Sequence, residues 1–296
     1  MTVASAGCGA GHRAGPVQSA PSPVAHAVDG APSHIAVVVL ENKEYSDVIG
    51  SPQAPYINRL ARGYALARNL YAVAHPSLPN YLALTGGSTF GIDSDCTDCS
   101  VSATSLADQL DHAGLSWKAY MEGIPHSCFT GPDSSGDYAK KHDPFSYYTR
   151  VMTNPARCRR IVPLSQLHVD ERAGGLPAFV WITPNLCHDM HDCSVATGDR
   201  FLAGLVPALL RALGPRGLLI VTWDEGTSDD GCCRVAAGGR VAAILAGGLA
   251  RPRARLDTPA DLYSVLQMVE DLLGLRRLRG AACPCTPSLQ PLLRTS

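Results

Sequence analysis

Two pairs of neighbouring polar residues could together hold a metal ion. Glu41-Asn42 and Asp224-Glu225 each follow directly on an apolar run that has the composition of a buried strand. Carboxylates crowded into one site repel one another and acquire raised pKa values unless a cation lies between them. Carboxylate oxygens together with an amide carbonyl suit a divalent ion. The pairs therefore predict a metal site, and the alternative is that each pair only caps a helix or turn.

Ser77 is the candidate nucleophile, because it stands just before a predicted helix. The free N–H groups and partial positive charge of a helix N-terminus would stabilise an alkoxide and the phosphate attached to it. A metal ion touching the hydroxyl would lower its pKa further. His75 and Asn80 flank this serine and could contact phosphoryl oxygens. The alternative for Ser77 is a serine that only caps the helix.

The segment 185–192 carries two histidines three residues apart, with carboxylates beside them. His188 and His191 could bind metal, hold a phosphate oxygen or protonate a leaving alcohol. Asn185 and Asp189 in the same segment are candidates for substrate contact. A polar surface loop without a chemical role is the alternative.

A small basic cluster offers a further contact for an anionic substrate. Lys141 and His142 follow Lys140 within residues 122–165, which are rich in Gly, Pro and Ser and show little periodicity. Segments of this length without clear elements are usually functional or tied by disulfides. A solvated face is an equally good interpretation of the cluster.

The elements that must position these residues alternate between strands and helices. Such alternation predicts an α/β fold with a mostly parallel sheet covered on both faces, in which ligands bind beyond the carboxyl ends of the strands. The helix at 258–273 has Thr258 as candidate N-cap and Pro259 as its first residue. The expected strands are 35–40, 115–120, 178–183, 218–223 and 241–245, and the other expected helices are 55–64, 81–84, 105–112 and 201–213.

Composition limits the partners and the number of domains. The chain has 296 residues, 46% of them apolar, and a net charge of −1 without a long basic block. This argues against nucleic acid as the main partner, and the absence of an 18-residue apolar run argues against a transmembrane helix. We expect a disordered leader at 1–33 and one domain at 34–296.

The cysteines indicate an exported protein. There are eleven, several of them close together, and exported proteins use such cysteines as disulfides. Setting Cys8 aside leaves ten, enough for five bridges, whereas a structural zinc site would call for two C-x-x-C pairs and only Cys96–Cys99 has that spacing. Small residues before Cys8 resemble the end of a lipoprotein signal, so a lipid anchor there and an ordinary N-terminal segment are the two alternatives.

Four ordered motifs resemble a known family. Glu41-Asn-Lys-Glu-Tyr, His75-Pro-Ser-Leu-Pro-Asn-Tyr, Asn185-x-x-His-Asp-Met-His and Thr222-Trp-Asp-Glu resemble the bacterial phosphoesterase family of acid phosphatases and phosphatidylcholine-type phospholipases C. The resemblance covers roughly residues 34–275. Within the family the chain is most similar to short secreted acid phosphatases, which include a mycobacterial enzyme acting on phosphatidylinositol 3-phosphate.

The resemblance implies a fold, a reaction and roles for residues. The fold is an alkaline-phosphatase-like α/β/α sandwich, and the reaction is hydrolysis of phosphoric esters in small phosphorylated substrates or phosphoinositide head groups. The residues that match metal ligands are Glu41, Asn42, Asp224 and Glu225, together with the nucleophile Ser77. His75 and Asn80 match positions near the phosphoryl group, and His188 and His191 match the histidine-bearing loop of the family. Serine as nucleophile favours a phosphatase with a phosphoserine intermediate over a phospholipase C.

Two departures from the family pattern bear on substrate range. Relatives often have histidine where this chain has Leu262, and the adjacent Cys232 and Cys233 follow the Asp224-Glu225 pair at the edge of the expected site.

Besides a phospholipase C, the rival functions are an inactive binding protein and another metal-dependent hydrolase such as a sulfatase. The intact site residues argue against an inactive binding protein, and the missing sulfatase motif argues against a sulfatase.

Overall fold

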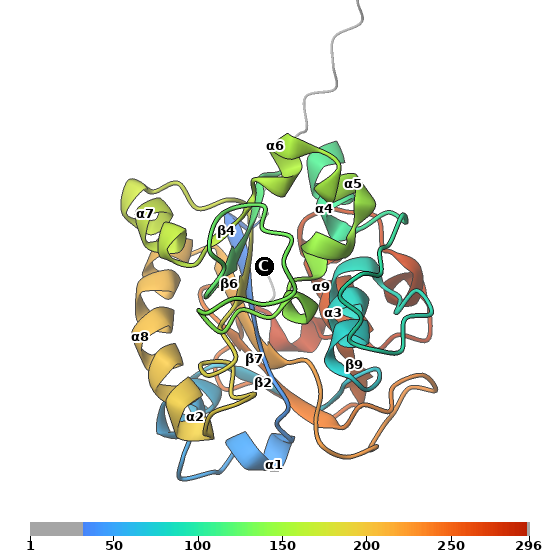
Figure 1. Ribbon diagram of the computed structural model, residues 1–296. Coiled ribbons are helices and arrows are strands. Elements are labelled where there is room, and N and C mark those ends of the chain that lie inside the picture. The colour runs from blue at the N-terminus through green and yellow to red at the C-terminus, as the bar shows by residue number, and fades with distance from the viewer. Residues whose placement is uncertain (1–31, 295–296) are drawn as a thin grey trace, which may run out of the picture.

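One sheet organises the residues that the structure describes. The computed structural model describes residues 32–294, and helices cover both faces of their nine-stranded sheet (Figure 1). The strands are β1 (His34–Leu40), β2 (Ala65–Tyr71), β3 (Trp117–Met121), β4 (Ile161–Pro163), β5 (Phe179–Thr183), β6 (Gly217–Trp223), β7 (Arg240–Ala246), β8 (Arg255–Leu256) and β9 (Ala260–Asp261).

The strand order explains why motifs far apart in sequence meet. The order is β4-β3-β5-β1-β6-β7-β2-β8, with β9 paired to β2. Strand β1 lies between β5 and β6 and is parallel to both, while β7 is antiparallel to β6 and to β2. The register pairs Leu40 with Trp223, so the residues that follow β1 and β6 leave the sheet side by side. The predicted α/β class with a mostly parallel sheet is confirmed.

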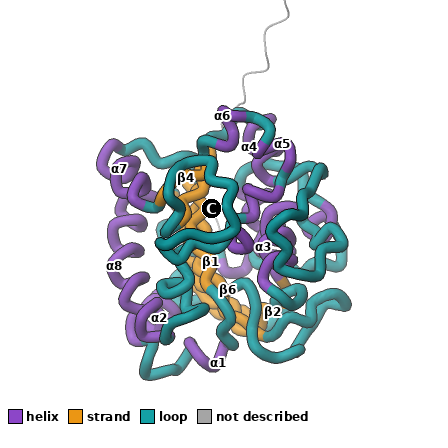
Figure 2. Tube along the Cα trace, in the orientation of Figure 1, coloured by secondary structure: helices purple, strands orange, loops and turns teal. Residues whose placement is uncertain are grey.

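The helices form a layer on each side of the sheet. Figure 1 shows α2, α7 and α8 along one face and α3, α4 and α9 along the other. Figure 2 shows the long loops that join these elements. The α-helices are α1 (Tyr45–Val48), α2 (Pro55–Gly63), α3 (Ser77–Gly86), α4 (Leu106–His112), α5 (Thr149–Met152), α6 (Pro155–Cys158), α7 (Ser165–Ala173), α8 (Val195–Leu213) and α9 (Leu262–Leu272). Short 3-10 helices lie at Lys140–His142, Pro144–Tyr147, Arg279–Ala282 and Gln290–Leu292.

Three helix boundaries differ from the sequence-based expectation. Helix α3 begins at Ser77, four residues before the expected start at 81, so Ser77 is its first residue. Helix α8 begins six residues before the expected start at 201, with Ser194 as its N-cap. Thr258 and Pro259 do not begin α9, because the chain first pairs with β2 through β9. Asp261 is the N-cap instead, and it exchanges hydrogen bonds with Ser264 as a capping box. Leu262, the first residue of α9, is fully buried.

The core lies in the middle of the sheet. All seven residues of β6 are buried, and β1 is buried from Ile35 to Leu40. These continuous apolar runs are what a strand covered on both faces requires. Among residues 32–294, no helix combines the length and the apolar character needed to span a bilayer.

Five disulfides form, as the cysteine count predicts. The pairs are Cys96–Cys99, Cys128–Cys158, Cys187–Cys193, Cys232–Cys233 and Cys283–Cys285. Only the second closes a longer loop, with a sequence separation of 30, and it ties the irregular region 122–165. Closing a long loop restricts the unfolded chain most, so this bridge contributes most to stability. Cys8, the candidate lipid anchor, lies outside the described residues.

Candidate active site

The two acidic pairs meet at the carboxyl ends of β1 and β6. Glu41 follows β1 and Asp224 follows β6, and both side chains are fully buried. The backbone N–H of Asn42 donates to Asp224 Oδ1 at 3.1 Å, and Asn42 adopts a positive φ of 52° as the chain turns away from the sheet. The strand register thus joins residues that are almost two hundred positions apart.

Ser77 lies between the carboxylates of the two pairs. It is the first residue of α3 and is only 1% exposed. Its hydroxyl lies 3.0 Å from Glu41 Oε2 and 3.3 Å from Glu225 Oε1. One turn further along α3, the hydroxyl of Tyr81 donates to Glu41 Oε1. The hydroxyl at the N-terminus of α3 is therefore held by two potential proton acceptors.

Glu41, Ser77, Asp224 and Glu225 form a group that we call the Ser77 cluster. This cluster carries an excess of negative charge. Burial raises the pKa of Asp224 well above its ordinary value, and the charges of Glu41 and Glu225 add to this. Burial also raises the pKa of Glu225. Asp224 Oδ2 is buried and accepts no hydrogen bond from any described residue. A buried carboxylate oxygen without a partner is costly unless it contacts a cation, so the oxygens around Ser77 fit a divalent ion.

His142 supplies a positive charge on the opposite side of Glu41. Its Nε2 lies 3.2 Å from Glu41 Oε2, and its Nδ1 lies 3.3 Å from Asp189 Oδ2. Burial lowers the pKa of His142, but the two carboxylates outweigh burial and raise it to about 9. Burial raises the pKa of Glu41, yet the charge of His142 and the hydrogen bonds of His142, Tyr81 and Asp224 together outweigh burial, and the net shift is downward. The two residues form a buried ion pair.

His191 and Lys141 extend the site beyond His142. His191 Nδ1 lies 2.6 Å from Asp192 Oδ1, and its Nε2 lies 3.3 Å from Lys141 Nζ. Lys141 also pairs with Asp95 at 3.0 Å. Glu41, His142 and His191 each offer one ligand atom within 4.8 Å of the others, which makes them a second donor set that shares Glu41. The structure thus brings His191, Lys141 and His142 to the Ser77 cluster.

His75 and Asn80 shape the loop before α3. The ring of His75 pairs with Glu225 and lies 3.0 Å from the carbonyl of Ser228. Asn80 Oδ1 accepts from the backbone N–H groups of Val73 and Ala74 at 2.8 and 3.0 Å, and its amide donates to two carbonyls of the same loop. The side chain of Asn80 is therefore fully engaged in bracing the loop that carries His75.

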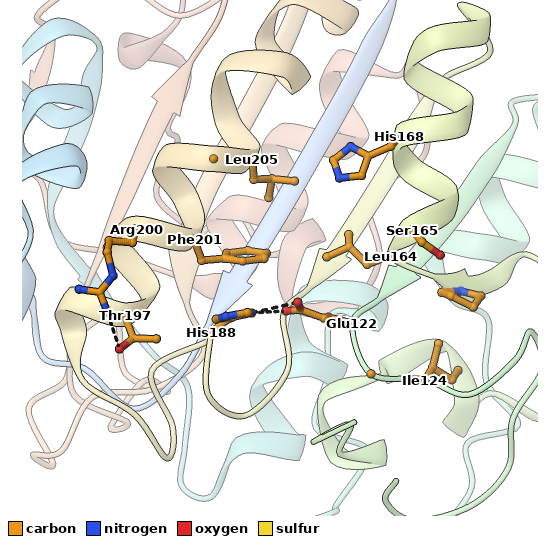
Figure 3. Close-up of a pocket in the computed structure, with 13 residues that line it drawn as sticks. Glu122, Ile124, Leu164, Ser165, His168, His188, Thr197, Arg200, Phe201 and Leu205 are labelled. Carbon is orange, nitrogen blue, oxygen red and sulfur yellow. Dashed lines mark hydrogen bonds and ion pairs between the residues drawn. The ribbon is translucent and has the colours of Figure 1, made fainter. Parts of the chain in front are cut away.

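His188 faces away from Ser77. Its Nδ1 donates to both oxygens of Glu122 at 2.9 Å, and its ring stacks on Phe201 with centroids 4.8 Å apart (Figure 3). Asn185 caps the turn, because its Oδ1 accepts from the His188 backbone at 2.9 Å. Met190, with φ of 81°, reverses the chain so that His191 returns to the cluster. The two histidines of one motif thus have different surroundings: His188 lines a cavity, whereas His191 contacts Lys141.

Three residues of these networks were not expected from the sequence. Tyr81 could have been found, because it lies four positions after Ser77 and so shares its helix face. Asp95 carried no pattern that linked it to Lys141, and it also accepts from the backbone of Leu78 at 3.0 Å. Glu122 directly follows β3, just as Glu41 directly follows β1, so the same rule could have identified it.

The sequence of this chain matches a family model and several characterised relatives. The model of the phosphoesterase family matches residues 50–276, an interval that contains Ser77, His191 and Asp224 but not Glu41. The phosphatidylinositol-3-phosphatase of Mycobacterium tuberculosis is 35% identical over 245 residues, which cover 82% of this chain and 77% of that protein. An acid phosphatase of Aspergillus fumigatus is 32% identical over 275 residues, covering 88% of this chain and 59% of that protein. The chain thus spans about three fifths of that fungal enzyme.

Solved structures share the fold. A protein of the alkaline phosphatase superfamily from Vibrio parahaemolyticus superimposes with a TM-score of 0.58 at 16% identity, covering 86% of this chain and 70% of its own. The murine ectonucleotide pyrophosphatase/phosphodiesterase 5 gives 0.56 at 13% identity, covering 88% of this chain and 100% of its own. The alkaline-phosphatase-like fold is confirmed. Fold, family match and relatives agree, and the chain belongs to the phosphoesterase family, as a hydrolase of phosphoric ester bonds.

Proposed function

We propose that this chain is a metal-dependent phosphomonoesterase that attacks with Ser77 and passes through a phosphoserine. The observation that carries the proposal is the buried Ser77 hydroxyl at the N-terminus of α3, within hydrogen-bonding distance of Glu41 and Glu225. The relatives named acid phosphatase and phosphatidylinositol-3-phosphatase support a monoester substrate. Small phosphorylated alcohols, including phosphoinositide head groups, form the substrate class.

The chain's own residues supply the proton transfers. Ser77 gives its proton to a neighbouring carboxylate as Oγ forms a bond to phosphorus and the bond to the alcohol oxygen breaks. His191 acts in its imidazolium form, in which Nε2 protonates the departing oxygen and Asp192 at Nδ1 orients the ring. Water then attacks the phosphorus and gives a proton to His191, while the carboxylate returns its proton to Ser77 Oγ as the Oγ–phosphorus bond breaks, which releases phosphate and restores the hydroxyl. Lys141 contacts phosphoryl oxygens during both steps, and His75 holds Glu225 in place.

The residues around Ser77 fit a divalent cation. Bound among the oxygens of Glu41, Asn42, Asp224 and Glu225, it would lower the pKa of the Ser77 hydroxyl and offset phosphoryl charge. The partnerless Oδ2 of Asp224 favours this oxygen-rich set. The other donor set is less suitable, because both ring nitrogens of His142 already pair with carboxylates.

The donor sets are separable by metal content. Asp224→Asn should reduce the bound metal per chain, measured by elemental mass spectrometry on desalted protein, whereas His142→Gln should leave most of it. The reverse pattern would move the ion to the set of Glu41, His142 and His191. Undiminished turnover after exhaustive chelation would argue against any metal dependence.

The nucleophile and the substrate class have their own experiments. Ser77→Ala should lower kcat/KM for p-nitrophenyl phosphate at least about a thousand-fold, and acid-quenched wild-type enzyme should carry phosphate on Ser77. Ser264→Ala is the matched control, because Ser264 is likewise buried near a helix N-terminus but lies outside the cluster. Faster cleavage of phosphatidylcholine than of monoesters would favour the phospholipase C alternative.

We also propose that the protein acts outside the reducing cytosol. Five disulfides fit an oxidising compartment. Fractionation of the producing cell, with thiol labelling of each fraction, tests this. Recovery of fully reduced protein from the cytosol would contradict export.

A further inference from the structure

A large cavity lies on the outer side of the loop that bears His188. Its volume is ≈ 940 Å³, and it opens beyond the ends of β3 and β4, between α7 and α8 (Figure 3). None of the residues that line it belongs to the Ser77 cluster. The volume falls within the range of about 300–1,000 Å³ typical of small-molecule sites. The proposed chemistry leaves this cavity without a role.

The floor of the cavity is apolar. Ile124, Leu164 and Leu205 line it and are 4%, 8% and 5% exposed. Phe201 adds an aromatic ring from α8, and Figure 3 shows this ring lying over His188. Such a surface gains free energy when it covers apolar atoms of a ligand, so the cavity suits an apolar body.

The polar group nearest the floor is an oriented histidine. His188 Nδ1 donates to both oxygens of Glu122 at 2.9 Å, which fixes the ring and leaves Nε2 without a partner among residues 32–294. Glu122 Oε2 also accepts from the Asn185 backbone at 3.0 Å. Glu122 is thus engaged by its own neighbours, and it does not present a free carboxylate to a cationic ligand.

Arg200 on the rim has no carboxylate partner among the described residues. The guanidinium of Arg200 contacts only Thr197 Oγ1, at 3.3 Å, and forms no ion pair within the described part of the chain. His168, the other basic residue of the rim, pairs with Glu171 at 3.2 Å. A guanidinium free of carboxylates beside an apolar floor favours an anionic group on the ligand.

We infer that this cavity is a second ligand site, which binds a small amphipathic anion. The apolar body of the ligand lies on Phe201, Leu205 and Leu164, and its anionic head contacts Arg200. A metal ion is a poor alternative, because the three-residue donor group found among the described residues lies at Glu41, His142 and His191 instead.

Gly204 allows a test in which the cavity is filled. It lies on the exposed side of α8 at the cavity wall, and a Cβ added there meets no atom within 4 Å. Gly204→Trp places a ring in the cavity, whereas Gly204→Ala is the matched control that changes the backbone in the same way without filling it. Thermal unfolding of both variants verifies that each is folded.

The probes are 8-anilinonaphthalene-1-sulfonate, followed by fluorescence, and dodecanoate, followed by calorimetry, each with the full chain. Wild type should bind both saturably. Gly204→Trp should weaken binding at least about ten-fold and Gly204→Ala less than about three-fold, and Arg200→Gln should weaken dodecanoate about ten-fold. Inorganic phosphate should not displace either probe, because it binds at the Ser77 cluster.

Three results would overturn the inference. The first is an absence of saturable binding to wild type. The second is equal affinity of wild type, Gly204→Trp and Arg200→Gln, which would place the probes on other surfaces. The third is competitive displacement by phosphate, which would show that the probes occupy the Ser77 cluster.

Discussion

Neutralising one carboxylate of the cluster should raise stability without metal and reduce the stabilisation that metal brings. Glu225→Gln keeps the shape of the side chain and leaves an oxygen that can accept from Ser77, which lies 3.3 Å from Glu225 Oε1. The change removes one negative charge from a site where burial and the charge of Glu41 already raise the pKa of Glu225. The unfolding free energy of the variant should therefore exceed that of the wild type in chelator. Added metal should raise the unfolding free energy of the variant by less than that of the wild type.

The structure sets the size of this effect. Glu41 Oε2 and Glu225 Oε1 both contact Ser77 Oγ, so they cannot lie more than about 6 Å apart. Two unit charges at that distance repel by about 3 kcal/mol at an effective dielectric constant of 20. Loss of the pair with His75, which is 35% exposed, offsets at most about 1 kcal/mol of this gain. We expect a net stabilisation of about 1–3 kcal/mol in chelator.

Added metal should shrink or abolish this advantage of the variant. An ion at a hundred times its dissociation constant stabilises the wild type by about 2.7 kcal/mol, and a variant that lacks one ligand gains less. Urea unfolding with chelator and with each divalent ion measures both quantities. Asp257→Asn is the control, since Asp257 is 65% exposed and pairs with Arg68 far from the cluster. Destabilisation of Glu225→Gln in chelator by more than about 1 kcal/mol would refute the reasoning.

Three further changes test other parts of the structure. His142→Gln leaves Glu41 buried without its cation and should cost about 3–5 kcal/mol in urea unfolding; a smaller loss than for a surface variant would deny the ion pair. Asn80→Ala removes four hydrogen bonds to the loop before α3 and should lower both stability and turnover, by about 2–4 kcal/mol for stability; unchanged activity would show that the loop needs no brace. Burial raises the pKa of Glu270 to about 8, so the unfolding free energy should fall as the pH rises from about 5 to 8. Glu270→Gln should flatten this fall, measured by urea unfolding across that pH range. A variant whose unfolding free energy falls as steeply as that of the wild type would contradict the raised pKa.

Residues whose place follows from neighbouring strands could be predicted from the sequence. Glu41 and Asp224 were expected together because each follows a continuous apolar run, and parallel strands deliver such residues to one edge. The start of α8 could not be placed in the same way. Its first turns contain Asp199, a buried carboxylate that accepts from the backbone of Tyr56 and Ile57 at the N-terminus of α2. The reason for a buried charge there lies in another helix.

The histidine loop shows the same limit within a single motif. His188 and His191 are equivalent in type and spacing, and no pattern in the sequence says which of them faces Ser77. Their directions depend on the Asn185 cap and on the positive φ of Met190, which turn one ring towards Glu122 and return the other to Lys141. Backbone reversals at residues other than glycine leave little trace in composition.

Helix α3 shows how one local spacing arranges three residues of the candidate site. Ser77 at its first position, Asn80 three residues later and Tyr81 four residues later lie on one face, since a helix repeats every 3.6 residues. That face presents the hydroxyl between two carboxylates, braces the preceding loop and donates to Glu41. The proposed nucleophile, the brace of its loop and an anchor for a neighbouring carboxylate thus share one local spacing. The orientation of the helix cannot be predicted from this spacing. It depends on contacts such as the hydrogen bond from the Leu78 backbone to Asp95, which form only in the folded chain.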